Sequence, residues 1–237
     1  MLEKNRIGEK IFADVSRHLN EVGLMMHGGT IIAANLIVAS KSTKNRDGKC
    51  DPEMHQTKNS NEWHFGMKVH ADADAGSGDI HTIIGTSANI HDVLETSKLL
   101  REDGHVMYGD SGYQGVPERP AIKENEVLSK TEFRINKRPS SLKMADNFKG
   151  LNWDKKMEHD KSSVCCKVEH VFLIVKNQMG YAKAVYRGIG NLKLILCIIC
   201  QCQPSDVQQG WPNPGLSGVY GIVRPLGGKH LQTRDTS

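Results

Sequence analysis

DSGYQGVPERP, at Asp110–Pro120, follows a short apolar stretch, and KVEHVFLIVK, at Lys167–Lys176, lies in a predicted long helix. Asp110 therefore leaves a strand for a loop, and Glu169 lies in the middle of a helix. Seven residues advance an α-helix by almost two turns, so Lys176 is expected on the same face as Glu169. Carboxylates that can bind a divalent cation, beside an ammonium that can bind a phosphate, suit metal-dependent phosphoryl transfer on nucleic acid.

Three blocks of this sequence resemble bacterial insertion-sequence transposases of the DDE type. They are residues 54–93, GDSGYQGVPER at Gly109–Arg119, and KVEHVFLIVKNQMGYAKAVYRG at Lys167–Gly188. The resemblance runs colinearly from about Glu9 to Gly188. It implies an α/β fold of the ribonuclease-H-like type, a mixed sheet with flanking helices. The order of the predicted strands and helices is compatible with that fold.

The resemblance also implies a catalytic site. Asp110 and Glu169 match the second and third acids of the family, which would bind Mg²⁺, and Lys176 would contact a DNA phosphate. Without the resemblance, each residue has a simpler interpretation. Asp110 before Ser-Gly is a common turn residue, and Glu169 could be a solvated carboxylate paired with Lys176 or Lys167. The resemblance favours the catalytic interpretation.

Several positions depart from the family pattern. Within GTIIAANLI at Gly29–Ile37, Ala33 stands where the first catalytic aspartate belongs. Asp72, on a neighbouring predicted strand, is a conceivable substitute. The arginine expected one helical turn before Glu169 is Cys165, and a tyrosine expected three residues earlier is Ser162. A cation site would therefore lose one of three acids, and the DNA-phosphate contacts would be reduced.

Composition sets broader limits. The 237 residues are 38% hydrophobic, enough for one substantial core, and the net charge of +4 is only mildly basic. The longest apolar run, Leu194–Cys200, has seven residues and cannot span a bilayer. We therefore expect an intracellular protein with its six cysteines reduced, and the resemblance implies that it is bacterial, cytoplasmic and associated with the nucleoid. The CxxC at Cys197–Cys200 has no second pair at zinc-site spacing, so a buried apolar segment is favoured.

The hydrophobic pattern predicts a first set of elements. Residues 4–26 form a helix ending near Gly23, and Thr30–Ala39 is a buried strand. The charged segment at 41–58 is expected to be a loop. Residues 63–71 and 79–85 form a hairpin around Ala75–Gly78.

A second set follows the hairpin. Ser87 or Asn89 caps a helix whose buried face carries Val93, Leu94 and Leu100. A strand at 105–109 comes next, and residues 119–160 are expected to be connecting structure. The helix that bears Glu169 is marked by apolar residues spaced three or four apart, namely Val164, Val168, Phe172, Val175 and Met179.

These patterns divide the chain into a leading helix at 1–28, a catalytic core at 29–190 and a degenerate, poorly ordered tail at 191–237. Family members carry a DNA-binding region ahead of this helix, so we expect a truncated, decayed copy. The predicted function is that of a DNA transposase, Mg²⁺-dependent in strand cleavage and strand transfer, inactive here because of Ala33. The alternative is a catalytically dead DNA-binding or pairing remnant that interferes with intact transposase; a homodimer is compatible with both. An unrelated cysteine-bearing structural protein is the third, least favoured interpretation.

Overall fold

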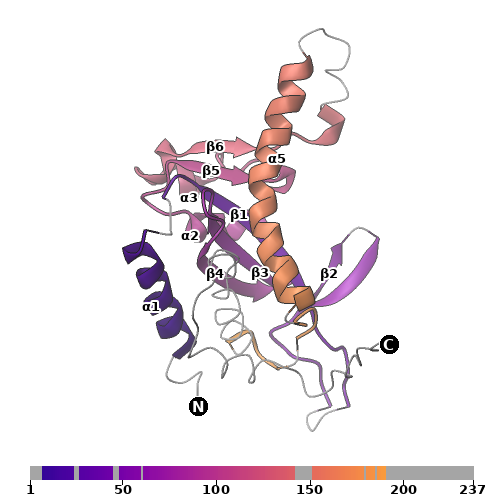
Figure 1. Ribbon diagram of the computed structural model, residues 1–237. Helices are drawn as coiled ribbons and strands as arrows, with labels where there is room; N and C mark the ends of the chain where they lie inside the picture. Colours follow the sequence, from indigo (N-terminus) through magenta and orange to yellow (C-terminus); the bar gives the residue numbers. More distant parts are fainter. Residues whose placement is uncertain are drawn as a thin grey trace, which may run out of the picture.

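The fold is a six-stranded mixed sheet with helices on both faces, seen in a computed structural model that describes residues 7–23, 27–44, 48–59, 61–141, 151–178, 180–184 and 186–190 (Figure 1). The strands are β1 (Thr30–Val38), β2 (His55–Asn59), β3 (Glu62–Asp74), β4 (Ile80–Ser87), β5 (Val106–Gly109) and β6 (Glu132–Ile135). Their order is β2-β3-β1-β5-β6, with β4 paired to β3. β1 is antiparallel to β3 and parallel to β5, and β5 is parallel to β6.

The helices and short helical turns connect these strands. They are α1 (Ile7–Glu21), α2 (Asp92–Leu99), α3 (Pro120–Lys123) and α5 (Leu151–Leu173), with the 3₁₀ turns η1 (Ser111–Tyr113) and η2 (Leu128–Lys130) and the π-helical segment η3 (Ile174–Gln178). In Figure 1, α5 is the long orange helix that crosses the sheet from β6 toward β2.

Two hydrophobic clusters form on opposite faces of the sheet, because successive side chains of a strand alternate. On one face, Ile31, Ala71 and Ala73 pack against Val168 and Phe172 of α5. On the other face, the second cluster combines a strand β1 residue with residues from α2 through η2, namely Ile32, Leu99, Leu100, Met107, Tyr113, Val116, Ile122 and Leu128. The sheet is thus the middle layer of three, as the α/β prediction requires.

Most of the predicted elements are confirmed. The strand at Thr30–Ala39 is β1, the hairpin is β3 and β4, and the strand before Asp110 is β5. The leading helix ends at Glu21, where Gly23 follows with a φ of 76°. Glycine adopts this left-handed conformation without the Cβ clash of other residues, as expected for a helix C-terminus.

Other expectations are wrong. His55–Asn59, expected within or beside a loop, is a strand paired antiparallel with β3. β6 arises in the segment expected to be connecting structure, where it pairs with β5, and α5 begins at Leu151. Helix α2 is capped by His91, whose Nδ1 accepts from Val93 N, rather than by Ser87 or Asn89. Of the residues expected on its buried face, Leu100 is buried and Val93 packs against the second cluster, whereas Leu94 is exposed. The helix also buries Glu95, Thr96 and Leu99. The expected tail at 191–237, with its CxxC, lies outside the described residues, as does Met179.

Candidate active site

A cavity of about 290 Å³ lies where β1 and β5 separate. The two strands pair only at Thr30 and Ile31, so among the described residues this edge of β1 has no strand partner from Ile32 until Val38, which forms a parallel bridge with Lys183. Ala33, Asp110 and Glu169 all line this cavity, as the sequence predicted, together with Ile32, Ala34, Asn35, Asp92, Tyr113, Cys165, Val168 and Phe172. Residues more than 130 positions apart in the sequence thus meet at one site.

The position of Asp110 follows from the turn that it caps. It leaves β5 with an extended backbone, and its Oδ1 accepts a hydrogen bond from Gly112 N at 2.8 Å. A Cβ on Gly112 would approach that oxygen to 2.9 Å, so the glycine keeps the turn tight. The turn interpretation and the site interpretation of Asp110 are therefore compatible, because one oxygen caps η1 while the carboxylate borders the cavity.

Glu169 enters the same cavity from α5. Neither lysine that the sequence offered as a partner takes that role: Lys167 Nζ donates to the backbone oxygens of Ala75 and Gly76 at 2.6 and 2.7 Å, and Lys176 Nζ donates to Asn35 Oδ1. Within the described part of the chain, the Glu169 carboxylate is left facing solvent and the cavity.

Cys165 lies one helical turn before Glu169 and lines the cavity with it. Burial raises the pKa of its thiol to about 11, and the charges of Asp110 and Glu169 act in the same direction. Both carboxylates are therefore close enough to influence this thiol. At neutral pH the position holds an uncharged group next to two negative ones, where an arginine would have balanced them.

Ala33 faces α5 and the cavity, and Asp72 faces the other way. In the β1–β3 pairing Ala33 lies opposite Ala71, whereas Asp72 lies opposite Ile32, whose side chain belongs to the cluster on the other face. Asp72 is fully buried there, with an oxygen 3.4 Å from Arg101 Nε. Because neighbouring strand residues point to opposite faces, Asp72 cannot replace the missing acid.

Asp92 is a residue of the site that the sequence interpretation missed. As the first residue of α2 it lines the cavity with Asp110 and Glu169, and one of its oxygens accepts from Lys68 Nζ at 2.9 Å. Burial raises the pKa of the Tyr113 hydroxyl above its usual range, with smaller contributions from Asp92 and Asp110. An acid at a helix N-terminus is favoured by the helix dipole, so the sequence signal for this residue was structural rather than catalytic.

Lys176 contacts a residue that lines the cavity, Asn35, and is not itself among the lining residues. It belongs to η3, where the backbone changes from α- to π-helical geometry. The α-helical spacing that was expected between Glu169 and Lys176 therefore does not apply over the whole interval. Its ammonium is held by the side chain of Asn35, which lines the cavity, and burial lowers its pKa.

The model of the transposase DDE domain family matches residues 34–202 of this chain. The chain belongs to the DDE transposase family. No solved structure matches it. The matched region of this transposase contains Asp110, Glu169 and Lys176, and it begins one residue after Ala33. The mixed sheet with flanking helices agrees with the ribonuclease-H-like fold of such transposases, and no described helix is long and apolar enough to cross a membrane.

The family normally uses a divalent metal ion, so the ligand set of this transposase needs testing against one. Among the residues that the structure describes, no three His, Cys, Asp or Glu side chains are grouped so that they could bind an ion. Asp110 and Glu169 offer two carboxylates to the cavity, residue 33 contributes only a methyl group, and the Asp92 carboxylate is paired with Lys68. The residues present do not fit a site in which three acids share two ions.

Proposed function

We propose that this chain is the catalytic-core portion of an insertion-sequence transposase that binds DNA but no longer cleaves it. The observation that carries the proposal is the position of Ala33, whose methyl group faces the cavity lined by Asp110 and Glu169. In an intact site an acid here would be a ligand shared by both Mg²⁺ ions. Without it, the charges that stabilise the transition state of phosphoryl transfer have no fixed positions.

The unit proposed to carry this function is residues 29–190, preceded by a leading segment at 1–28 and followed by a separate tail at 191–237. β1 and α5, which contribute most of the residues that line the cavity, both fall within 29–190. DNA is the proposed partner because the family lysine is retained as Lys176, which contacts Asn35 of the cavity lining. Cys165, in place of an arginine, removes one cationic contact and implies weaker DNA binding than that of a relative with the complete cluster.

The test is a nicking assay in Mg²⁺ on a supercoiled plasmid that carries the DNA flanking this gene, with binding measured in parallel. We expect salt-sensitive binding and no nicking above the level of Asp110→Asn, the control for contaminating nuclease. Mg²⁺-dependent nicking by the unaltered protein that disappears in Asp110→Asn would show that another group replaces the acid missing at residue 33.

A further inference from the structure

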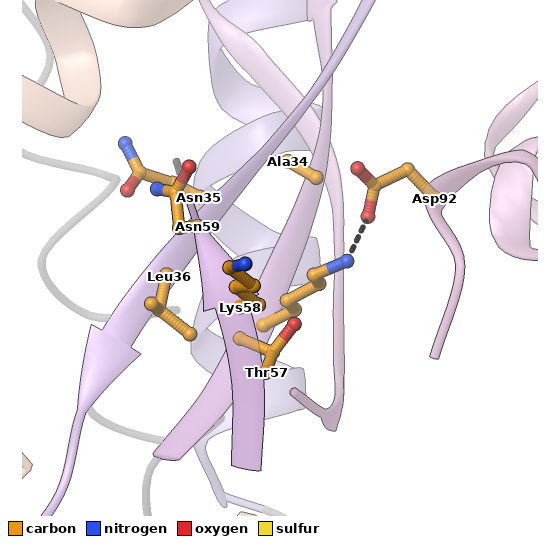
Figure 2. A pocket seen from close by; sticks show the side chains of 8 residues that line it. Ala34, Asn35, Leu36, Thr57, Lys58, Asn59 and Asp92 are labelled. Atoms are coloured by element: carbon orange, nitrogen blue, oxygen red, sulfur yellow. Dashed lines mark hydrogen bonds and ion pairs between the residues drawn. The ribbon is translucent and has the colours of Figure 1, made fainter. Parts of the chain in front are cut away.

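A second cavity, of about 280 Å³, adjoins the cavity that Asp110 and Glu169 line and is lined in part by the β2–β3 hairpin. Figure 2 shows the side chains that line this second cavity. Its lining comes from the open edge of β1, from β2 and β3, and from the start of α2, namely Ala34, Asn35, Leu36, Thr57, Lys58, Asn59, Lys68 and Asp92. Ala34, Asn35 and Asp92 line both cavities. The two are therefore neighbouring parts of one groove beside β1.

The charged groups of this second cavity leave it positive. Its one acid, Asp92, is neutralised by Lys68, whose Nζ lies 2.9 Å from Asp92 Oδ1 and 2.9 Å from the carbonyl oxygen of Ile90. The dashed line that ends on Asp92 in Figure 2 marks this ion pair. Lys58, from β2, is exposed and makes no ion pair with any residue that the structure describes. Its ammonium is thus available to an anion.

Neutral polar side chains line the same cavity. Figure 2 shows Asn35, Thr57 and Asn59, together with the apolar Leu36, among the residues that line it with Lys58. Lys176 can only donate, so the Asn35 oxygen is committed to it, and the amide NH₂ of Asn35 remains as a donor. An ammonium, amide NH₂ groups and a hydroxyl suit the oxygens of a phosphate, which accept and do not donate.

We infer that this second cavity binds a phosphodiester of a DNA strand that runs along the open edge of β1, away from Asp110 and Glu169. The inference rests on the proposed function, since it places part of the DNA at the same site. A lysine on an edge strand can also act only to discourage pairing with another sheet. Here, however, Lys58 shares a cavity with amide donors and a neutralised acid, and that cavity opens beside the carboxylates of the family site.

The experiment measures DNA binding across a salt series with a short labelled duplex, for the unaltered chain, Lys58→Gln and the control Lys10→Gln. Lys10 is exposed on α1, which lies across the molecule from β2 in Figure 1. Losing one phosphate contact lowers the slope of log K against log salt by about one unit. We expect that loss in Lys58→Gln alone, and recovery of the slope in Lys58→Arg.

The outcomes separate the two proposals. If the unaltered chain binds with a salt slope that Lys58→Gln leaves unchanged, the phosphate site is overturned and the proposed function stands. If the unaltered chain shows no salt-sensitive binding, the proposed function is overturned, and the phosphate site that rests on it is overturned as well. If Lys58→Gln unfolds, Asn59→Asp provides an independent test, because it adds a negative charge to the same cavity. The phosphate site requires that Asn59→Asp weaken DNA binding while its melting temperature stays that of the unaltered chain.

Discussion

Residue 33 is a single methyl group on the wall between β1 and α5, and the cavity beside it has room for a larger side chain. Ala33→Asp would add a carboxylate to the cavity beside Asp110 and Glu169 that is not already paired with a lysine, as Asp92 is. We expect this variant to gain Mg²⁺-dependent thermal stabilisation that the unaltered chain lacks, because an ion that binds only the folded state stabilises it. The gain is about 2.7 kcal/mol when the free ion is a hundredfold above its dissociation constant.

The control for that substitution is Ala33→Asn, which has nearly the same shape and no charge. Melting temperatures would be compared with Mg²⁺ and with a chelator. Equal responses of the two variants to Mg²⁺ would mean that residue 33 is an ordinary packing position and that the first acid lies elsewhere in the sequence.

The sequence identified some residues of this site and missed others, and the reasons lie in the individual residues. Asp110 and Glu169 were identified by the motifs around them, and they do line one cavity. Whether Asp72 could help depended on its strand register, and a shift of one residue would have turned it to the other face. Asp92 had no motif that linked it to the site, and only the position of α2 brings its carboxylate to the cavity.

Among the elements, those with a strong hydrophobic pattern were predictable and those specified by pairing were not. β1 and the β3–β4 hairpin carry continuous or alternating apolar residues. β2, with the sequence HQTKN, has no apolar residue, and it is a strand because β3 supplies its hydrogen bonds. β6 is only four residues long and depends in the same way on β5.

Gly66 shows how closely these elements approach. It is paired with Val38 of β1 and with His55 of β2, and a Cβ built on it would lie 2.1 Å from the carbonyl oxygen of Ile37. Since that neighbour is backbone, it cannot rotate away, and Gly66→Ala must separate the strands. We expect a loss of about 3 kcal/mol in the free energy of unfolding, measured by urea denaturation.

The matched control for Gly66→Ala is Thr57→Ala on β2, a partly exposed position where a side chain becomes smaller. A loss below about 0.5 kcal/mol for Gly66→Ala, within the range of ordinary surface substitutions, would show that the strands adjust without strain.

At the scale of the whole molecule, the face of the sheet away from α5 carries a polar group that runs from the buried Asp72 to the exposed His27 and links several segments. Arg101, after α2, lies against Asp72 of β3 and His81 of β4, with Nη1 at 3.3 Å from His81 Nδ1. His27 joins this group through Asp103 at 2.8 Å and through Asn20 of α1 at 2.8 Å. Asp72 and His81 are the members of this group whose pKa is shifted by burial, so their protonation is coupled to global unfolding.

The pKa shifts of Asp72 and His81 have opposite effects on stability. Burial raises the pKa of Asp72 to about 7, although Arg101 acts against this, so the folded state loses stability as pH rises from the unfolded value of about 3.9. Burial, and then the charge of Arg101, lowers the pKa of His81 to about 4, so the folded state loses stability as pH falls below about 6.5. Between these limits the two residues largely offset each other.

Asp72→Asn should expose the contribution of His81. We expect the stability of Asp72→Asn, relative to the unaltered chain, to increase as pH rises from about 4 to 7, because only the unaltered chain must ionise a buried carboxyl; each pKa unit corresponds to about 1.4 kcal/mol. His81→Gln should show the reverse, a relative gain as pH falls from about 6.5 to 4. Urea unfolding at several pH values measures both differences, in which all other titrating groups cancel. If the difference in stability between Asp72→Asn and the unaltered chain stays constant with pH, Asp72 is ionised throughout, held by Arg101 despite its burial.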